Sequence, residues 1–497
     1  MDADRLKEDC REGRVDVDRL VELVVALQRE LQAAKRRIAE LEQKLGTAPT
    51  QKIDEPFSVR AEERRQEARG KKRRKRKPPL RCGRITTADK IARASRTEEV
   101  FPVGVSKEDC RLSHTRPVWR LENGQAVLVA YAIYRGPRNL YGKISGVLGR
   151  SEFGIEIVVA IAYQVFVVGL SFDKVCLLLN FFQNLKLTKS QADALLNQLS
   201  RHWESEFEVL CTLLANSLVV NSDETSWSIN SVWAFLSENV RVLFFGVHKD
   251  ADTLQQILDP ATFAGTLISD DAAVYAHFTN SQKCWAHLLR KAIKLTLLEP
   301  SNNEYRQFTD RLLEIYWSAC RVQRDKRLSD AGRARKVSEL DDAILQLCGS
   351  MWFAELPSGE GPANDYRLLV NELMRLMLAK QLFPFVTSAA AEAPNGETVP
   401  VSGTNNEAER TLRSAADARK TGRTSKTLRG ARRRTVVVSV LESLRRHLTL
   451  FTLSSVIDEI LRWSAEGFSC FSKLLSKRKL EAPRSPLLDC LFPAPSG

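Results

Sequence analysis

Short apolar runs that end in polar residues organise the middle of the chain. The run Leu218–Val220 is followed by Asn-Ser-Asp-Glu, which predicts a buried strand whose end carries acidic side chains. Further strands are predicted at Val232–Ser237, Val240–Val247 and Gly265–Asp270, with a short helix over Ala251–Leu258 before the last of them. This order of strands with a connecting helix predicts an α/β domain built on one sheet.

Two of the predicted strands end in pairs of acids. Asp223 and Glu224 follow the first strand, and Asp270 and Asp271 follow the last. Strands that are adjacent in a sheet lie about 5 Å apart, so carboxylates at their ends can share divalent metal ions. Because neighbouring side chains on a strand point to opposite faces, one acid of each pair should face the site. We choose Asp223 and Asp270, and we expect Asp271 to cap a helix that begins near Ala272.

Helical periodicity surrounds the predicted sheet. Residues 151–216 predict helices with Ser171 and Thr188 as N-caps. Two helices joined by a short turn resemble a DNA-binding helix-turn-helix, although a helical packing module explains the pattern equally well. The expected segments from there on are a sheet domain at 217–465, a helical insertion within it at about 288–390, and a flexible tail at 466–497.

The N-terminal pattern has a heptad spacing. Apolar residues recur in steps of three and four from Val17 to Leu45, which predicts a coiled coil over residues 1–50. Such a coiled coil would make the protein a homodimer or a higher oligomer. An amphipathic helix that packs on its own domain is the alternative.

Residues 81–150 are expected to form a small mixed α/β segment or a degenerate zinc-finger-like one. Alternation around Asn123-Gly124 predicts a hairpin. Cys82, Cys110 and His114 could supply a metal, but their spacing fits no zinc pattern, so ordinary structural roles are the better interpretation.

Charge adds a polyanionic partner to this picture. The chain of 497 residues has a formal net charge of +14 and a pI near 9.3, which favours nucleic acid as the partner. Residues 51–80 predict a disordered basic linker, because their charges repel one another and no apolar face is present. The predicted phosphate-binding residues of this linker are Lys71, Lys72, Arg73, Arg74, Lys75, Arg76 and Lys77. A merely solubilising linker is the alternative, but seven consecutive like charges exceed that need.

Cysteine usage and hydropathy predict a cytoplasmic protein. The ten cysteines are scattered without a CxxC pair, which favours reduced thiols. The N-terminus lacks the features of a signal peptide. The most apolar run, Ile155–Leu170, is interrupted by Gln164 and is shorter than the roughly 20 residues of a membrane span. It therefore predicts a buried helix, and no membrane partner is expected.

A third carboxylate is needed for a well-held pair of metal ions, and the candidate is Glu409. It lies in a predicted helix after Thr404, a plausible N-cap. Glu409 and Arg413 lie on one face of this helix at i and i+4. The surrounding sequence is strongly basic, which suits a DNA backbone lying across the site. The candidate DNA-binding residues here are Arg410, Arg413, Arg419 and Lys420.

Four ordered motifs resemble transposases of the insertion sequence 66 family. They are DETSW at 223–227, SDDAAVY at 269–275, CWAHLLRK at 284–291, and TNNEAERTLR followed by ARK within 404–420. The resemblance implies a ribonuclease-H-like catalytic domain with an Asp-Asp-Glu triad formed by Asp223, Asp270 and Glu409. That family commonly carries a cysteine-rich zinc segment before the catalytic domain, and this chain does not match it. Cys284 and His287, three residues apart, could be half of a metal site, but a structural role or a position near the DNA path is the stronger interpretation.

The resemblance implies an enzyme that cleaves the ends of an insertion sequence and joins them to target DNA. Its cofactor would be Mg²⁺ or Mn²⁺, bound by the three acids. Its partners would be element ends, target DNA and possible accessory proteins of the same element, in a bacterial-type cytoplasm at the nucleoid. The alternatives are a ribonuclease-H-like nuclease without strand transfer and an inactive or domesticated DNA-binding protein.

Overall fold

The computed structural model describes residues 85–352, 361–388, 390–392, 398–481 and 486–493, together with positions 25, 28, 29 and 32. The chain divides into two units, Met1–Lys72 and Arg73–Gly497. The four described positions of the first unit are helical. The rest of the predicted coiled coil, and the basic run from Lys71 to Lys77, lie outside the described residues. The account below concerns the second unit.

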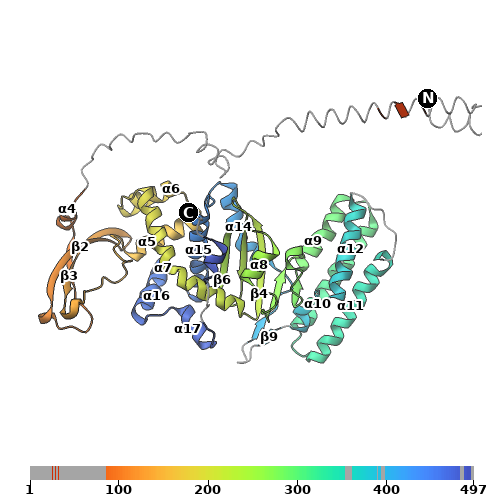
Figure 1. Ribbon diagram of the computed structural model, residues 1–497. Coiled ribbons are helices and arrows are strands. Elements are labelled where there is room, and N and C mark those ends of the chain that lie inside the picture. Colours follow the sequence, from red (N-terminus) through yellow and green to blue (C-terminus); the bar gives the residue numbers. More distant parts are fainter. Residues whose placement is uncertain are drawn as a thin grey trace, which may run out of the picture. The chain divides into compact units, whose positions relative to one another are not determined.

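A five-stranded mixed sheet forms the centre of this unit (Figure 1). Its strands are β4 (Val219–Ser226), β5 (Ser231–Leu236), β6 (Arg241–Val247), β7 (Thr266–Ser269) and β8 (Ser281–Lys283). They lie in the order β6-β5-β4-β7-β8. β4 and β6 are antiparallel to β5, whereas β4, β7 and β8 run parallel to one another. The four predicted strands are confirmed. β4 is longer than predicted, and β8 was not predicted.

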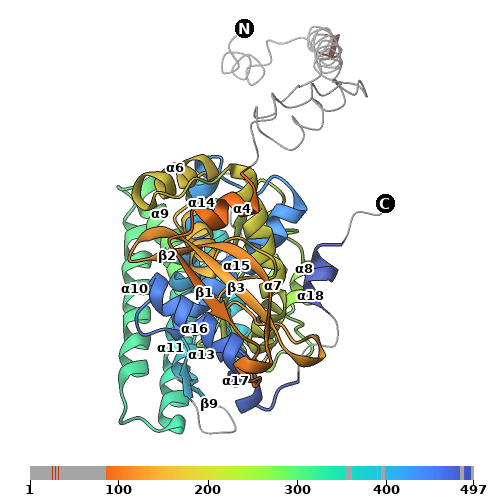
Figure 2. The same ribbon diagram turned by 90° about the vertical axis from the view of Figure 1, so that its left-hand side faces the viewer.

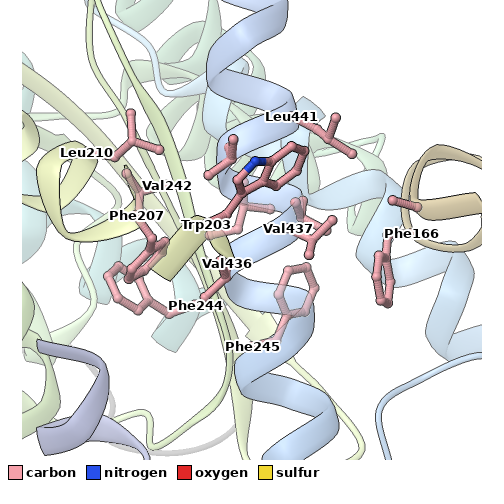
Figure 3. Packing of buried hydrophobic residues seen from close by; sticks show 14 of the residues in the cluster. Phe166, Trp203, Phe207, Leu210, Val242, Phe244, Phe245, Val436, Val437 and Leu441 are labelled. Carbon is pink, nitrogen blue, oxygen red and sulfur yellow. The ribbon is translucent and has the colours of Figure 1, made fainter. Parts of the chain in front are cut away.

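One face of the sheet is covered by α7 (Lys189–Ala215), which begins at the predicted N-cap Thr188. Figure 3 shows Trp203 and Phe207 of α7 among the buried side chains of β6 and of α15 (Leu428–His447). The Phe207 ring meets Phe244 of β6 edge-on at a centroid distance of 5.6 Å. The apolar face of α7 is therefore occupied by packing within this unit. The short helix α8 (Ala251–Ile257) is also confirmed, with Asp250 as its N-cap.

β6 is an edge strand of this sheet, and its outward-facing amides donate hydrogen bonds to hydroxyl groups of α15. Four residues of a helix rise about 6 Å, close to the roughly 6.8 Å spanned by two residues of a strand. Side chains at every fourth helical position can therefore reach every second amide of the edge. The three bonds run from the amides of Phe245 to Thr435 Oγ1 (2.9 Å), Leu243 to Ser439 Oγ (2.9 Å) and Arg241 to Ser443 Oγ (3.0 Å). This covering removes an edge that would otherwise pair with other strands.

Helices fill the sequence between β8 and the region of Glu409 (Figure 1). They are α9 (Trp285–Leu298), α10 (Asn303–Arg324), α11 (Asp330–Trp352), α12 (Pro362–Leu378) and α13 (Pro384–Thr387), followed by the hairpin strands β9 (Ala390–Glu392) and β10 (Thr398–Pro400). Leu312, Ile344 and Leu373 are fully buried in a hydrophobic cluster separate from the main core. This cluster reaches the sheet at Val219 and Ile268.

A second, three-stranded sheet precedes these elements (Figure 2). It follows α4 (Thr87–Ala92) and consists of β1 (Arg96–Val100), β2 (Arg111–Glu122) and β3 (Gln125–Arg135). The predicted hairpin between β2 and β3 is confirmed, and Asn123 and Gly124 both have positive φ, at 48° and 78°. Two positive φ values are what a tight hairpin turn requires. Cys82 lies outside the described residues. Cys110 Sγ donates to the carbonyl of Ser106.

The helix predicted in the apolar run Ile155–Leu170 is α-helical only in its first half. α5 (Ile155–Ala162) is buried throughout and continues into a π-helical turn that contains Gln164. The next helix, α6 (Phe172–Gln183), begins at the predicted N-cap Ser171. None of the helices within the described residues is both long and apolar enough to cross a membrane.

The C-terminal segment is more ordered than expected. After α16 (Leu453–Glu466) the chain forms α17 (Cys470–Lys477) and α18 (Leu487–Leu491). Phe471 of α17 and Leu488 of α18 are buried in the main core. The expectation of a flexible tail is therefore wrong for these helices, because their few apolar side chains pack against the sheet domain.

Candidate active site

The register of two parallel strands places Asp223 and Asp270 level with each other. β4 pairs with β7 through Val219, Val220 and Asn221, and the last of these lies opposite Ile268. Asp223 is two residues beyond Asn221, and Asp270 is two residues beyond Ile268. Side chains two residues apart share a face, so the two acids leave adjacent strands at the same level. Asp223 does not end its strand as expected, because β4 continues to pair with β5.

The neighbour of Asp270 has a different role from the one predicted. The expectation that Asp271 caps a helix near Ala272 is wrong, because the chain forms a single 3-10 turn there with no side-chain cap. Asp271 is paired with Arg375 of α12. Asp270 Oδ1 instead accepts a hydrogen bond of 3.1 Å from the amide of Ala272.

Glu224 lies on the opposite face of β4 from Asp223. Its side chain is only 2% exposed and pairs with Lys249 Nζ at 2.6 Å. It also accepts a hydrogen bond from the Tyr275 hydroxyl, which in turn lies 3.2 Å from Ser222 Oγ. Glu224 is therefore a buried and fully partnered carboxylate.

Asp223 has the opposite electrostatic environment. Burial, together with the charges of Glu224, Asp270 and Glu409, raises the pKa of Asp223 to about 7. The described residues place no cation in ion-pair contact with Asp223 or with Asp270. Like charges that gather without a cation raise one another's pKa, and a bound cation removes that penalty. The site is therefore electrostatically suited to a divalent ion.

Glu409 reaches this site on α14 (Asn406–Lys420), which packs against β4 and β5. Its N-terminus is fastened by Asn405, which is fully buried. Asn405 Nδ2 donates to the Ser222 carbonyl at 2.7 Å, and its Oδ1 accepts from Asn221 Nδ2 at 3.2 Å. The prediction of Thr404 as the N-cap is wrong, because Asn405 takes that position and uses its side chain to hold β4.

The carboxylate of Glu409 is held by α9. Arg290 Nη2 bonds Oε2 at 2.8 Å and Oε1 at 3.0 Å, and His287 Nδ1 lies 3.7 Å from Oε1. Arg413, which shares a helix face with Glu409, makes no ion pair with it within the described part of the chain. The charge of Glu409 acts on Asp223, but its carboxylate is directed toward Arg290 and His287.

The four basic residues predicted on α14 are all exposed. Arg419 donates to the Ser226 carbonyl at 2.9 Å and so ties the end of α14 to the end of β4. Arg410 lines a pocket of about 550 Å³ between α14, α15 and β6. Arg413 and Lys420 are exposed on the same helix.

Several residues of the site were missed by sequence reasoning. Three of them, Asn405, Tyr275 and Arg290, lie inside the four sequence motifs. The motifs include these positions but do not predict which residues they contact. Lys249 lies outside every motif. Lys283 was also missed: it is 3% exposed and donates to Ser269 Oγ at 3.2 Å, and burial lowers its pKa.

Acids from two parallel strands thus lie near a third acid from a late helix, whose charge acts on the first of them. The family model described as Transposase IS66 family matches residues 150–433. This match covers more than half of the chain, so the protein belongs to that family of transposases. A comparison with curated protein sequences finds no match.

Proposed function

We propose that this transposase cleaves phosphodiester bonds at the ends of an insertion sequence and joins the 3′-ends to target DNA. The sheet domain would be ribonuclease-H-like. The order β6-β5-β4-β7-β8, antiparallel in its first three strands and parallel in its last three, supports this fold. The single observation that carries the proposal is the register that sets Asp223 level with Asp270, in an acidic site where neither carboxylate has an ion-pair partner among the described residues.

Asp223, Asp270 and Glu409 would hold two divalent cations, Mg²⁺ or Mn²⁺. When bound, the cations would supply activation of the attacking oxygen and stabilisation of the leaving oxygen. Oxygen-only ligands of this kind suit hard ions such as these. Glu409 would have to exchange its bonds with Arg290 for the cations, because its carboxylate faces α9 in this structure.

The remaining residues of the site would position the acids and the DNA. Asn405 fixes the start of α14 against β4, so the position of Glu409 depends on it. Arg410, Arg413, Arg419 and Lys420 would contact phosphates along α14. The basic run from Lys71 to Lys77 would add salt-dependent, sequence-independent affinity.

The assembly and the setting are part of the same proposal. The N-terminal heptads would join two or more copies, as synapsis of two element ends requires. The protein would act at the nucleoid in a bacterial-type cytoplasm, with or without accessory proteins of the same element.

The test is a cleavage and joining assay on DNA that contains the element's own ends. With Mg²⁺, the wild-type protein should nick the ends and transfer a labelled 3′-end to a second duplex. Removing a ligand that supports several kcal/mol of transition-state stabilisation should lower the rate by about 10³-fold or more. We therefore expect Asp223→Asn and Asp270→Asn to abolish cleavage and to leave DNA binding nearly intact.

The matched control is Asp271→Asn, which removes the acid beside Asp270 that pairs with Arg375. It should retain cleavage. Cleavage by Asp223→Asn at the wild-type rate would show that the triad is wrong. Nicking without transfer of the labelled end would favour a nuclease, and metal-independent DNA binding without nicking would favour a regulator.

A further inference from the structure

Three side chains with different ligand atoms meet beside the acidic site. Cys284 is the N-cap of α9, His287 lies in the first turn of the same helix, and Glu409 comes from α14. Their sulfur, nitrogen and carboxylate oxygen atoms lie within 4.8 Å of one another. Among the described residues, no other group of three acids, histidines or cysteines is gathered this closely.

The sulfur of Cys284 is enclosed by hydrogen-bond donors. The residue is 1% exposed, and the amide of Asn405 donates to Sγ at 3.1 Å. The amides of Ala286 and His287, in the first turn of α9, also point at this sulfur. Burial raises the pKa of the Cys284 thiol and the N–H donors act against that rise, so a metal ion would displace the thiol proton on binding.

The imidazole of His287 offers an unused ligand atom. Its Nδ1 is shielded from solvent and has no hydrogen-bond partner within the described residues. Buried polar atoms without partners are rare in folded proteins, and each calls for a compensating group. This nitrogen faces Glu409 Oε1 at 3.7 Å, too far for a hydrogen bond but close enough for both atoms to bind one ion.

We propose that Cys284, His287 and Glu409 form a site for one thiophilic divalent cation of the zinc class. Thiolate and imidazole ligands select such ions, whereas Mg²⁺ prefers oxygen ligands alone. Bonds of about 2.0 to 2.3 Å require the three ligand atoms to move closer together than they are now. Arg290 can stay on Glu409 Oε2, at 2.8 Å, while Oε1 turns to the ion.

This site shares one ligand with the proposed catalytic set. A carboxylate held by a thiophilic ion on the α9 side is withdrawn from Asp223 and Asp270. The thiophilic ion would therefore act as a brake on cleavage, an implication that rests on the proposed function. The binding site itself does not, because it can be measured without DNA and without Mg²⁺.

The experiment is a titration of the purified full-length protein with Co²⁺ under reducing conditions, followed by absorption spectroscopy. We expect one Co²⁺ per chain with a thiolate-to-cobalt charge-transfer band, and Zn²⁺ should displace it. Cys284→Ser should abolish the charge-transfer band. His287→Ala, at a partly exposed position, should weaken Co²⁺ binding by about 10-fold or more, as expected when a metal ligand or its support is lost.

The matched control is Cys348→Ser, because Cys348 is a fully buried thiol whose pKa is raised to about 12 by burial alone. It should leave the band unchanged, and circular dichroism should show that all variants are folded. The absence of a charge-transfer band in the wild-type protein, or its persistence in Cys284→Ser, would overturn the proposal. Absence of Mg²⁺-dependent cleavage in wild-type protein that has been stripped of thiophilic ions, together with a normal cobalt signal, would instead count against the proposed function.

Discussion

The two faces of β4 carry neighbouring carboxylates in opposite electrostatic environments. On one face, Glu224 is 2% exposed and is neutralised by Lys249 and hydrogen-bonded by Tyr275. On the other, Asp223 is surrounded by further acids, and its pKa is raised to about 7. A buried charge with partners contributes to the fold, whereas one kept among like charges lowers stability unless something else binds there. This difference is the reason for assigning Glu224 to the fold and for proposing Asp223 as a metal ligand.

The largest expected effect is a gain in stability from Asp223→Asn. An acid whose pKa is higher in the folded protein than the ordinary 3.8 binds more protons when folded, so folding weakens as pH rises from 3.8 to about 7. The asparagine variant has no carboxyl group to ionise at this position, so it does not lose stability in this way as the pH rises. In EDTA at pH 8 its free energy of unfolding should exceed that of the wild type by about 2 to 4 kcal/mol. Urea denaturation at pH 5 and pH 8 should show the difference growing with pH.

The matched substitution on the other face is Glu224→Gln. It removes the ion pair between Lys249 and the buried Glu224 carboxylate. Because that interaction stabilises the fold, its loss should lower the free energy of unfolding by about 1 to 3 kcal/mol at pH 8. The two substitutions are thus expected to change stability in opposite directions. Changes of the same sign would mean that the two faces are not distinguished by their charges.

The next effect concerns the attachment of α14 to the Asp223 face. Asn405→Ala removes two hydrogen bonds to β4 at a fully buried position, so it should lower the free energy of unfolding by about 2 to 3 kcal/mol. Asn406→Ala, one residue later and exposed, should change it by less than about 0.5 kcal/mol. Equal effects in chemical denaturation would contradict the role of Asn405 as the attachment.

The contrast between the two faces could be predicted from sequence only in part. Apolar runs ending in acids, with the two-residue alternation of strands, predict that one acid of each pair faces the site, and the register sets Asp223 level with Asp270. Their role as metal ligands stays a prediction. The continuation of β4 to Ser226 was not predictable from the run, because it depends on pairing with β5. The role of Asp271 also escaped prediction, since its partner, Arg375, comes from α12.

The third acid shows the same limit more clearly. The helix around Glu409 follows from local propensity, and its acid was identified from the motif. Its partner, Arg290, is 119 residues away in sequence, because the helices from α10 to α12 lie between the two residues along the chain. No local pattern encodes a contact of that separation. Helical spacing favoured Arg413 instead, because that residue lies one turn further along the same helix.

The smallest expected effect tests whether Arg290 competes with metal for Glu409. Arg290→Gln should lower the Mg²⁺ concentration needed for half-maximal cleavage by up to about 5-fold, because an exposed ion pair contributes at most about 1 kcal/mol. Lys291→Gln is the matched control, since Lys291 pairs with Glu372 at 2.6 Å and not with Glu409. Mg²⁺ titrations at saturating DNA separate the two. An unchanged requirement in Arg290→Gln would mean that the ion pair between Arg290 and Glu409 does not compete with Mg²⁺ for this carboxylate.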